Sequence, residues 1–386
     1  MPISVLVVDD SVVIRRLVAS VLDEDPDITV VGTAANGRLA LAKLPSVSPD
    51  LITLDIEMPE LDGLGTLREL RKTDRTTPVV MFSTLTERAA RATLEALALG
   101  ANDYVTKPAN VGSVAAGMES VRSELIPKIK SLCAHRLGGA TTSATRAGTA
   151  VTAGVPSPRV AAPRVVPAAG PVTQTVPQVL AVGCSTGGPE ALAHVLKALP
   201  ADLPVPVVVV QHMPPIFTAM FAQRLDGACA LRVREAREGD ALEAGTVLIA
   251  PGDFHMRVRR QGTRTVVALD QGAQENFCRP AVDPLFRSVA DVYGAATLAV
   301  VLTGMGSDGR RGAEQLRGHG CEVVVQDEQT SVVWGMPGAV AGAGLATAVL
   351  ALDQVAPAVL RALTRAGLPA TTHAGAPALT GSGGRS

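Results

Sequence analysis

Short apolar runs alternate with amphipathic segments along the first third of the chain. Runs rich in β-branched residues occur at Ile3 to Val8, Thr29 to Gly32, Leu51 to Leu54, Val79 to Phe82 and Tyr104 to Thr106. Between them, apolar residues recur at helical spacing, as in Ile14, Leu17, Val18, Val21 and Leu22 and in Ala89, Ala92, Thr93, Ala96 and Leu97. This alternation predicts an α/β domain at residues 1–134, with a doubly wound five-stranded parallel sheet and helices on both faces.

A second alternating pattern begins at Gln178. Strand-like runs occur at Val179 to Gly183, Val205 to Gln211, Val247 to Ala250, Thr297 to Leu302 and Glu322 to Val325. Helical spacing occurs at Glu190 to Leu199, Ile216 to Leu225, Pro284 to Val292 and Arg310 to Gly318. A hairpin-like pair, Phe254 to Arg259 and Thr263 to Leu269, interrupts the pattern. We expect a second α/β domain at residues 178–366, with a mainly parallel doubly wound sheet plus a β-hairpin.

The segment between the two patterns has neither period. From Leu137 to Pro177 it is mostly Ala, Thr, Gly, Val and Pro, with three arginines and no carboxylate. This composition predicts a linker over residues 135–177. The end of the chain, residues 367–386, is rich in Ala, Gly, Thr and Ser and is predicted to be a disordered tail.

Composition narrows the class of protein. The formal net charge of −1 and the lack of a basic helix-turn-helix argue against a nucleic-acid partner. Five cysteines without a C-x-x-C pair fit reduced thiols better than disulfides or a zinc site. MPISVLVVDDS has no basic flank typical of a signal peptide, and no apolar run reaches the roughly 20 residues that span a bilayer. We therefore expect a cytoplasmic protein.

Three carboxylates follow strands of the first domain. Asp9 and Asp10 come after the first strand and Asp55 ends the third, so in a parallel sheet they meet at one edge. Grouped carboxylates suit Mg²⁺, which prefers oxygen ligands. Lys107 would add a positive charge at this edge, and Ser83 a hydroxyl. The alternative is that Asp9 and Asp10 cap the next helix.

The stretches VLVVDDS, LDIEMPELDGL, VVMFST and DYVTKP resemble the receiver domain of two-component response regulators. The resemblance implies that Asp55 accepts a phosphoryl group from a histidine kinase. The groups that it assigns to Mg²⁺ are Asp10, Asp55 and the Glu57 carbonyl, assisted by Asp9. The residues that it assigns to the phosphoryl group and its switch are Lys107, Ser83 and Tyr104. The first domain would then be a switch that controls the second.

A serine lies between glycines at the start of the second domain. LAVGCSTGGPEAL contains G-x-S-x-G, the nucleophile elbow that turns a strand into a helix and exposes the serine hydroxyl of Ser185. A helix N-cap is an equally good interpretation of this stretch alone. A phosphate cradle is less suitable, because the glycines fit neither dinucleotide-binding nor P-loop spacing.

A serine nucleophile needs a base, and histidine has a suitable pKa. Of the six histidines, His212 is the best candidate, because it directly follows an apolar strand at the edge expected for Ser185. The histidines less well placed to serve as the base are His135, His194, His255, His319 and His373. Asp308, in VVLTGMGSDGRRG, follows another strand and is the candidate orienting acid. A loop histidine and an aspartate in a turn are the alternatives for His212 and Asp308.

The stretches GCSTGGPEAL, QHMPPIFTAMFAQRL, APGDFHM, RPAVDPLFRSVA, VLTGMGSDG and SVVWGMPGAV resemble the catalytic domain of the chemotaxis protein-glutamate methylesterase (CheB) family. The resemblance implies a serine-type triad of Ser185, His212 and Asp308, with the Met305 N–H and neighbours such as Thr186 binding the oxyanion. A triad of this kind needs no cofactor in the catalytic domain. The implied substrates are glutamate methyl esters on helical, methyl-accepting chemoreceptors, and some members also deamidate glutamines.

The resemblance implies a role in chemotactic adaptation, with contact to membrane receptors only through binding them. We expect the unphosphorylated receiver to pack over the catalytic edge and phosphorylation to open it. Two other functions are alternatives to the methylesterase. One is a phosphorylation-controlled binding module with an inactive triad, and the other is a small-molecule esterase.

Overall fold

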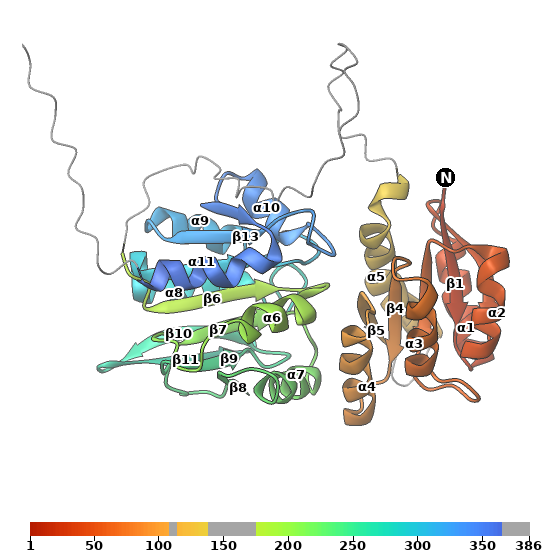
Figure 1. Ribbon diagram of the computed structural model, residues 1–386, viewed down its shortest axis with the longest axis horizontal. Coiled ribbons are helices and arrows are strands. Elements are labelled where there is room, and N and C mark those ends of the chain that lie inside the picture. Colours follow the sequence, from red (N-terminus) through yellow and green to blue (C-terminus); the bar gives the residue numbers. More distant parts are fainter. Residues whose placement is uncertain (108–113, 138–174, 365–386) are drawn as a thin grey trace, which may run out of the picture.

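The computed structural model describes residues 1–107, 114–137 and 175–364. These residues form two α/β domains that lie side by side (Figure 1). Most of the predicted linker and the whole predicted tail at residues 367–386 lie outside the described residues. Among the described residues, no helix is both long and apolar enough to cross a membrane.

The N-terminal domain is the predicted five-stranded parallel sheet, with strand order β2-β1-β3-β4-β5. Its elements are β1 (Ile3–Val8), α1 (Val12–Asp23), β2 (Ile28–Ala34), α2 (Gly37–Val47), β3 (Leu51–Asp55), α3 (Gly63–Thr73), β4 (Val79–Ser83), α4 (Glu87–Ala98), β5 (Asp103–Thr106), α5 (Val114–Leu132) and the 3₁₀ turn η1 (Ala134–Leu137). Strand order reverses between β1 and β3, and such a reversal opens a crevice at the carboxyl ends of these strands.

Both faces of this sheet are covered, as the continuous apolar strands predict. On β1, Val5 and Val7 pack with α1 and α5, whereas Leu6 and Val8 belong to the cluster that includes α3 and α4. Successive side chains point to opposite faces of a strand, so each apolar strand contributes residues to the hydrophobic core on both faces of the sheet.

The C-terminal domain is built on a seven-stranded sheet, with order β14-β13-β12-β6-β7-β9-β8 and all pairs parallel. Its elements are β6 (Val179–Cys184), α6 (Gly188–Lys197), β7 (Val207–Gln211), α7 (Phe217–Asp226), β8 (Arg232–Glu235), β9 (Thr246–Ile249), β10 (His255–Gln261), β11 (Arg264–Asp270), α8 (Val282–Tyr293), η2 (Gly294–Ala296), β12 (Thr297–Val301), α9 (Arg310–Gly318), β13 (Glu322–Gln326), α10 (Met336–Gly342), β14 (Ala348–Leu350) and α11 (Leu352–Thr364). The antiparallel hairpin β10–β11 forms a sheet of its own, as expected.

The sequence patterns predicted neither of the two edge strands, β8 and β14, and neither of the last two helices, α10 and α11. β8 reads RVRE with only Val233 fully buried, and β14 has three residues. α10 contains Pro337, and α11 contains Pro357. Short edge strands and helices that contain proline carry too little periodic signal to be recognised from local sequence.

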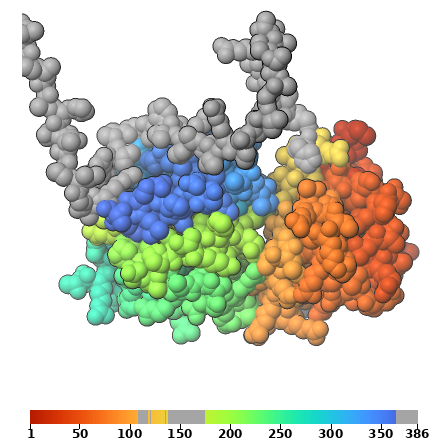
Figure 2. Space-filling model, in the orientation of Figure 1, coloured from red at the N-terminus to blue at the C-terminus, as the bar shows by residue number. Residues whose placement is uncertain are grey.

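The two domains pack through helices. α4 of the first domain lies against α6 and α7 of the second (Figures 1 and 2). The Tyr104 ring stacks on the Phe217 ring with centroids 4.8 Å apart and an interplanar angle of 3°. Buried apolar residues from both domains belong to one continuous cluster, so apolar contact contributes to the interface.

Candidate active site and phosphorylation site

Three neighbouring strands of the seven-stranded sheet lead to the candidate triad. β6 lies between β7 and β12, and all three run parallel. Ser185 follows β6, His212 follows β7, and Asp308 lies in the loop between β12 and α9. Chain order reverses at β6, so these residues lie at the edge where parallel sheets form ligand sites.

Ser185 occupies a tight turn rather than a helix cap. The N-cap of α6 is Gly187, which has φ +73° and offers no side-chain cap. The half-buried Ser185 hydroxyl forms no hydrogen bond within the described part of the chain. Gly304 approaches so closely that an added Cβ would lie 2.8 Å from the Ser185 Cβ. The turn therefore leaves the hydroxyl free and brings the backbone of the β12 loop beside it.

Two backbone N–H groups near Ser185 remain available. Neither the Thr186 nor the Met305 N–H donates a hydrogen bond within residues 175–364. Thr186 follows the serine, and Met305 follows Gly304, whose backbone lies against it. Unpaired donors beside a nucleophile are suited to stabilising a developing oxyanion.

The Asp308 carboxylate is buried and accepts five hydrogen bonds. The donors are His212 Nε2 at 2.8 Å, Val282 N at 2.6 Å, Asp283 N at 3.1 Å, Asn276 Nδ2 at 2.8 Å and Gly309 N at 2.9 Å. Burial alone would raise the pKa of Asp308, but the hydrogen bond from His212 and the N–H groups at the start of α8 hold it below its usual value. The lowered pKa favours the ionised carboxylate, which is suited to hold His212 in a fixed orientation.

The second ring nitrogen of His212 faces a thiol. Cys278 Sγ lies 3.5 Å from His212 Nδ1, and no hydrogen bond joins His212 to Ser185 within the described residues. Burial alone would lower the pKa of His212, but its contacts with Cys278 and with the Asp308 carboxylate together raise this pKa. Thus the structure brings His212 and Asp308 together, and Cys278 takes the position next to the free nitrogen.

We expect Cys278→Ala to shift the pH profile of hydrolysis toward acid. The base form of His212 is the neutral ring, which is lost as pH falls through its pKa. Removing Cys278 removes one group that raises this pKa, so the neutral ring persists to lower pH. Rates of ester hydrolysis measured from pH 5 to pH 10 test this shift. Cys229→Ala, a partly buried thiol that follows α7, is the matched control. Superimposable profiles for Cys278→Ala and the unaltered chain would contradict the role of the thiol.

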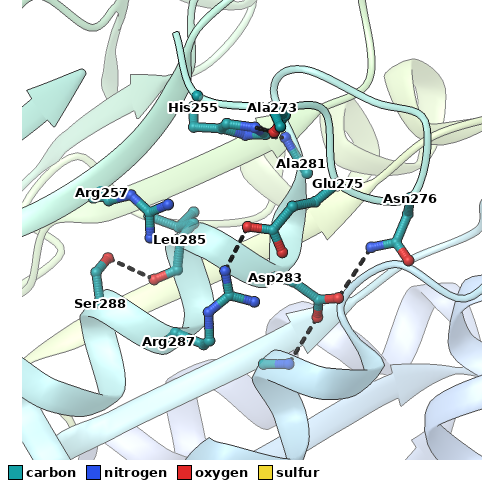
Figure 3. Close-up of polar contacts among 12 residues, drawn as sticks. His255, Arg257, Ala273, Glu275, Asn276, Ala281, Asp283, Leu285, Arg287 and Ser288 are labelled. Atoms are coloured by element: carbon teal, nitrogen blue, oxygen red, sulfur yellow. Dashed lines mark hydrogen bonds and ion pairs between the residues drawn. The ribbon is translucent and has the colours of Figure 1, made fainter. Parts of the chain in front are cut away.

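The other described histidines do not reach the site. His194 and His319 are exposed. His255 is buried and satisfied by backbone, because Nε2 lies 2.9 Å from the Ala273 carbonyl and Nδ1 accepts from Ala281 N (Figure 3). Its role is to support the loop between β11 and α8.

The predicted carboxylate cluster of the first domain is present. Ligand oxygens of Asp9, Asp10 and Asp55 lie within 4.8 Å of one another. Lys107 Nζ lies 2.8 Å from Asp9 Oδ2 and 2.7 Å from Asp55 Oδ2. One lysine leaves the cluster with an excess of negative charge, and its all-oxygen donor set fits Mg²⁺. The helix cap of α1 is Ser11, so neither aspartate is needed for it.

The surroundings of Asp55 disfavour the ionised form of its carboxyl group. Burial raises the pKa of Asp55 to about 6, with a contribution from Asp9, while Lys107 opposes the shift. We expect the affinity for Mg²⁺ to fall about tenfold per pH unit as pH drops below 6, because bound metal requires the ionised carboxylate. Calorimetric titration of the full chain between pH 5 and pH 8 measures this slope. Asp55→Asn should weaken binding and flatten the slope; an unchanged slope in that variant would contradict the assignment.

The two predicted switch residues lie between this site and the second domain. Ser83 is buried, and its Oγ accepts a hydrogen bond from Thr93 Oγ1 at 2.8 Å. Tyr104 is buried against Phe217, as described above. Glu57 lies beside Asp55, and its N–H is 3.4 Å from Asp55 Oδ1.

A hydrogen bond that the sequence did not suggest connects the two domains. Thr186 Oγ1 donates to Asp103 Oδ2 across the domain interface at 2.5 Å. Arg224 Nη1 donates to the Leu94 carbonyl across the same interface. The first domain therefore holds the residue next to Ser185. Asp103 lies in the stretch DYVTKP but was given no role there, and Cys278 and Asn276 lie outside the quoted motifs, so only their contacts mark them.

Comparisons with known proteins agree with this architecture. Residues 180–359 match the family described as CheB methylesterase, and residues 5–118 match the response regulator receiver domain. A protein-glutamate methylesterase/protein-glutamine glutaminase of Nocardioides sp. (strain ATCC BAA-499 / JS614) is 54% identical over 363 residues, which cover 94% of this chain and 96% of that protein. The corresponding protein of Trichodesmium erythraeum (strain IMS101) is 46% identical over 357 residues, which cover 92% and 98%. The crystal structure of the Thermotoga maritima CheB methylesterase catalytic domain is 41% identical, with a TM-score of 0.47, and covers 48% of this chain and 99% of that one.

Proposed function

The chain belongs to the CheB methylesterase family, with a receiver domain ahead of the catalytic domain, and we propose that Ser185, His212 and Asp308 perform its hydrolysis as a serine-type triad. The protein is a protein-glutamate methylesterase/protein-glutamine glutaminase under phosphorylation control, and it acts in chemotactic adaptation. We place the catalytic unit at residues 178–366 and the receiver at residues 1–134. A cytoplasmic location fits this role.

The observation that carries the mechanism is the five-donor environment of Asp308 with His212 as one of the donors. Because Asp308 binds Nε2, the remaining nitrogen, Nδ1, is the base. Ser185 Oγ attacks the ester carbonyl of a methylated glutamate and gives its proton to Nδ1. Asp308 stabilises the imidazolium that forms.

The rest of the cycle uses the same groups. The N–H groups of Met305 and Thr186 bind the oxyanion as the tetrahedral intermediate forms. His212 then protonates the departing oxygen, so methanol leaves and an acyl-enzyme remains on Ser185. Water, activated by His212, attacks the acyl-enzyme and releases glutamate. With a glutamine substrate the leaving group is ammonia, and the later steps are identical.

The receiver site fits phosphorylation of Asp55. Asp9, Asp10, Asp55 and the Glu57 carbonyl would hold Mg²⁺, which neutralises charge on the incoming phosphoryl group. Lys107, already 2.7 Å from Asp55, supplies a second positive charge. A histidine kinase is the phosphoryl donor, and the substrates are methylated chemoreceptors. The esterase domain requires no cofactor for this mechanism.

Interdomain contacts support a closed state before phosphorylation. We expect Arg224→Ala to raise the activity of the unphosphorylated chain roughly fivefold, since a hydrogen bond contributes about 1 kcal/mol to an interface. The phosphorylated enzyme should be unaffected. Methanol release with and without a small-molecule phosphoryl donor measures both states. Arg232→Ala, which removes an exposed arginine paired with Glu243, is the control. Equal unphosphorylated rates for Arg224→Ala and the unaltered chain would contradict this closed state.

Methanol release from a methylated receptor fragment also tests the hydrolytic function itself. A receptor-binding module with an inactive triad would bind the fragment and release no methanol. A small-molecule esterase would hydrolyse soluble esters equally well with or without a phosphoryl donor.

A further inference from the structure

Phe277 is the most exposed large apolar side chain of the catalytic domain. Its exposed fraction is 96%, although it lies in the loop that joins β11 to α8. The ring contributes nothing to the core. Exposure of one apolar residue is ordinary by itself, so its backbone and its neighbours must show whether this aromatic side chain has a role.

The backbone at this residue is as unusual as its exposure. Glu275 and Cys278 exchange backbone hydrogen bonds of 3.2 and 2.9 Å, which closes a turn with Asn276 and Phe277 at its centre. Both central residues have positive φ, +51° at Asn276 and +62° at Phe277. A turn of this kind favours Asn followed by Gly. The first position follows the rule, whereas the second holds a large aromatic residue where glycine is preferred.

The turn is fastened to the triad on both sides of Phe277. Asn276 Nδ2 lies 2.8 Å from Asp308 Oδ1. It also lies 3.0 Å from Asp283 Oδ2 (Figure 3). Cys278 Sγ lies 3.5 Å from His212 Nδ1. Phe277 thus stands between one residue that contacts the orienting acid and one that contacts the base.

Two further contacts hold the residues next to the turn in place. Glu275 pairs with Arg287 of α8 at 2.6 Å, and Asp283 also accepts from Gly312 N at 2.7 Å (Figure 3). These contacts hold the turn without help from the Phe277 ring. The backbone is therefore fixed while the ring remains free to meet another molecule.

We propose that Phe277 is a specificity-determining residue that receives an apolar side chain of the substrate helix, one turn away from the methylated glutamate. This inference rests on the proposed function, because it names how the same site holds its substrate. Residues three or four positions apart on a helix lie about 5–6 Å from each other. Phe277 lies between Asn276, which contacts Asp308, and Cys278, which contacts His212, so a substrate helix bound at the triad passes close to the turn that carries Phe277. Aromatic residues, phenylalanine among them, are enriched in the buried parts of protein interfaces.

Phe277→Gly separates this role from a structural one. Glycine relieves the unfavourable backbone conformation, so the thermal midpoint should stay equal or rise. For methylated receptor fragment, KM should increase about tenfold while kcat stays within about twofold, as expected when binding shared by ground and transition states is lost. Phe277→Tyr, which keeps the aromatic surface, should retain the KM of the unaltered chain. Leu39→Ala, an exposed apolar residue of α2 in the receiver, is the control for loss of exposed apolar area.

An unchanged KM in Phe277→Gly would overturn the proposal. So would a fall in kcat at unchanged KM, since the turn would then act only by positioning Asp308 and His212. Absence of methanol release from the unaltered chain would instead reject the proposed function, which keeps the two failures distinct.

Discussion

Replacing Ser185 by alanine is expected to lower methanol release from methylated receptor by at least about 10³-fold, because the reaction loses its nucleophile while the oxyanion donors remain. The fold should survive, since the Ser185 hydroxyl makes no hydrogen bond within the described residues. Phosphorylation of Asp55 should proceed normally, because it depends on the separate cluster of Asp9, Asp10 and Lys107.

Ser331→Ala provides the matched control in the same domain. Its hydroxyl donates to the Asp327 carbonyl at 2.7 Å and not to a triad residue, so its loss should leave methanol release near normal. Methanol release measured by gas chromatography, together with phosphoryl incorporation, reads out both domains. Ser185→Ala that retains hydrolysis would remove this residue from the mechanism.

Asp308→Asn is expected to reduce kcat by about 10³- to 10⁴-fold, because an amide neither stabilises the imidazolium nor holds its tautomer. It should also lower the free energy of unfolding by about 1–3 kcal/mol. The backbone N–H groups of Val282, Asp283 and Gly309 now donate to the Asp308 carboxylate. The amide nitrogen of asparagine cannot accept hydrogen bonds, so some of these N–H groups lose their acceptor.

Asp283→Asn distinguishes catalysis from stability. Asp283 is equally buried at the start of α8 and accepts from Asn276 and Gly312, but it does not contact His212. We expect it to lose stability and keep most of its kcat. Thermal melts and pre-steady-state burst kinetics provide the two measurements. A comparable collapse of kcat in both variants would show that Asp308 acts through packing alone.

Local sequence was sufficient where each signal lies within a few contiguous residues. The predicted strand at Val205 to Gln211 contains β7, and the β–α units of the receiver predicted its five-stranded parallel sheet. The same logic failed for β14, whose three residues contain no full alternation, and for α11, whose period is interrupted by Pro357.

The grouping of candidate site residues also followed from the chain itself, because parallel strands bring their carboxyl ends to one edge. That rule placed Ser185, His212 and Asp308 at neighbouring strand ends, and it placed Asp9 and Asp55 together in the receiver. The glycines around Ser185 indicated an exposed hydroxyl.

Tertiary structure alone decided the details that control reactivity. His212 meets Asp308 across 96 residues of sequence, Cys278 meets His212 across 66, and Thr186 meets Asp103 of the other domain across 83. No local period encodes such pairs. The sequence by itself determined two parallel sheets and the strand ends that carry the chemistry, since these depend on contiguous residues. Which histidine nitrogen contacts Asp308, which residue stands beside the other nitrogen and which residue of the receiver contacts Thr186 depend on packing between distant segments.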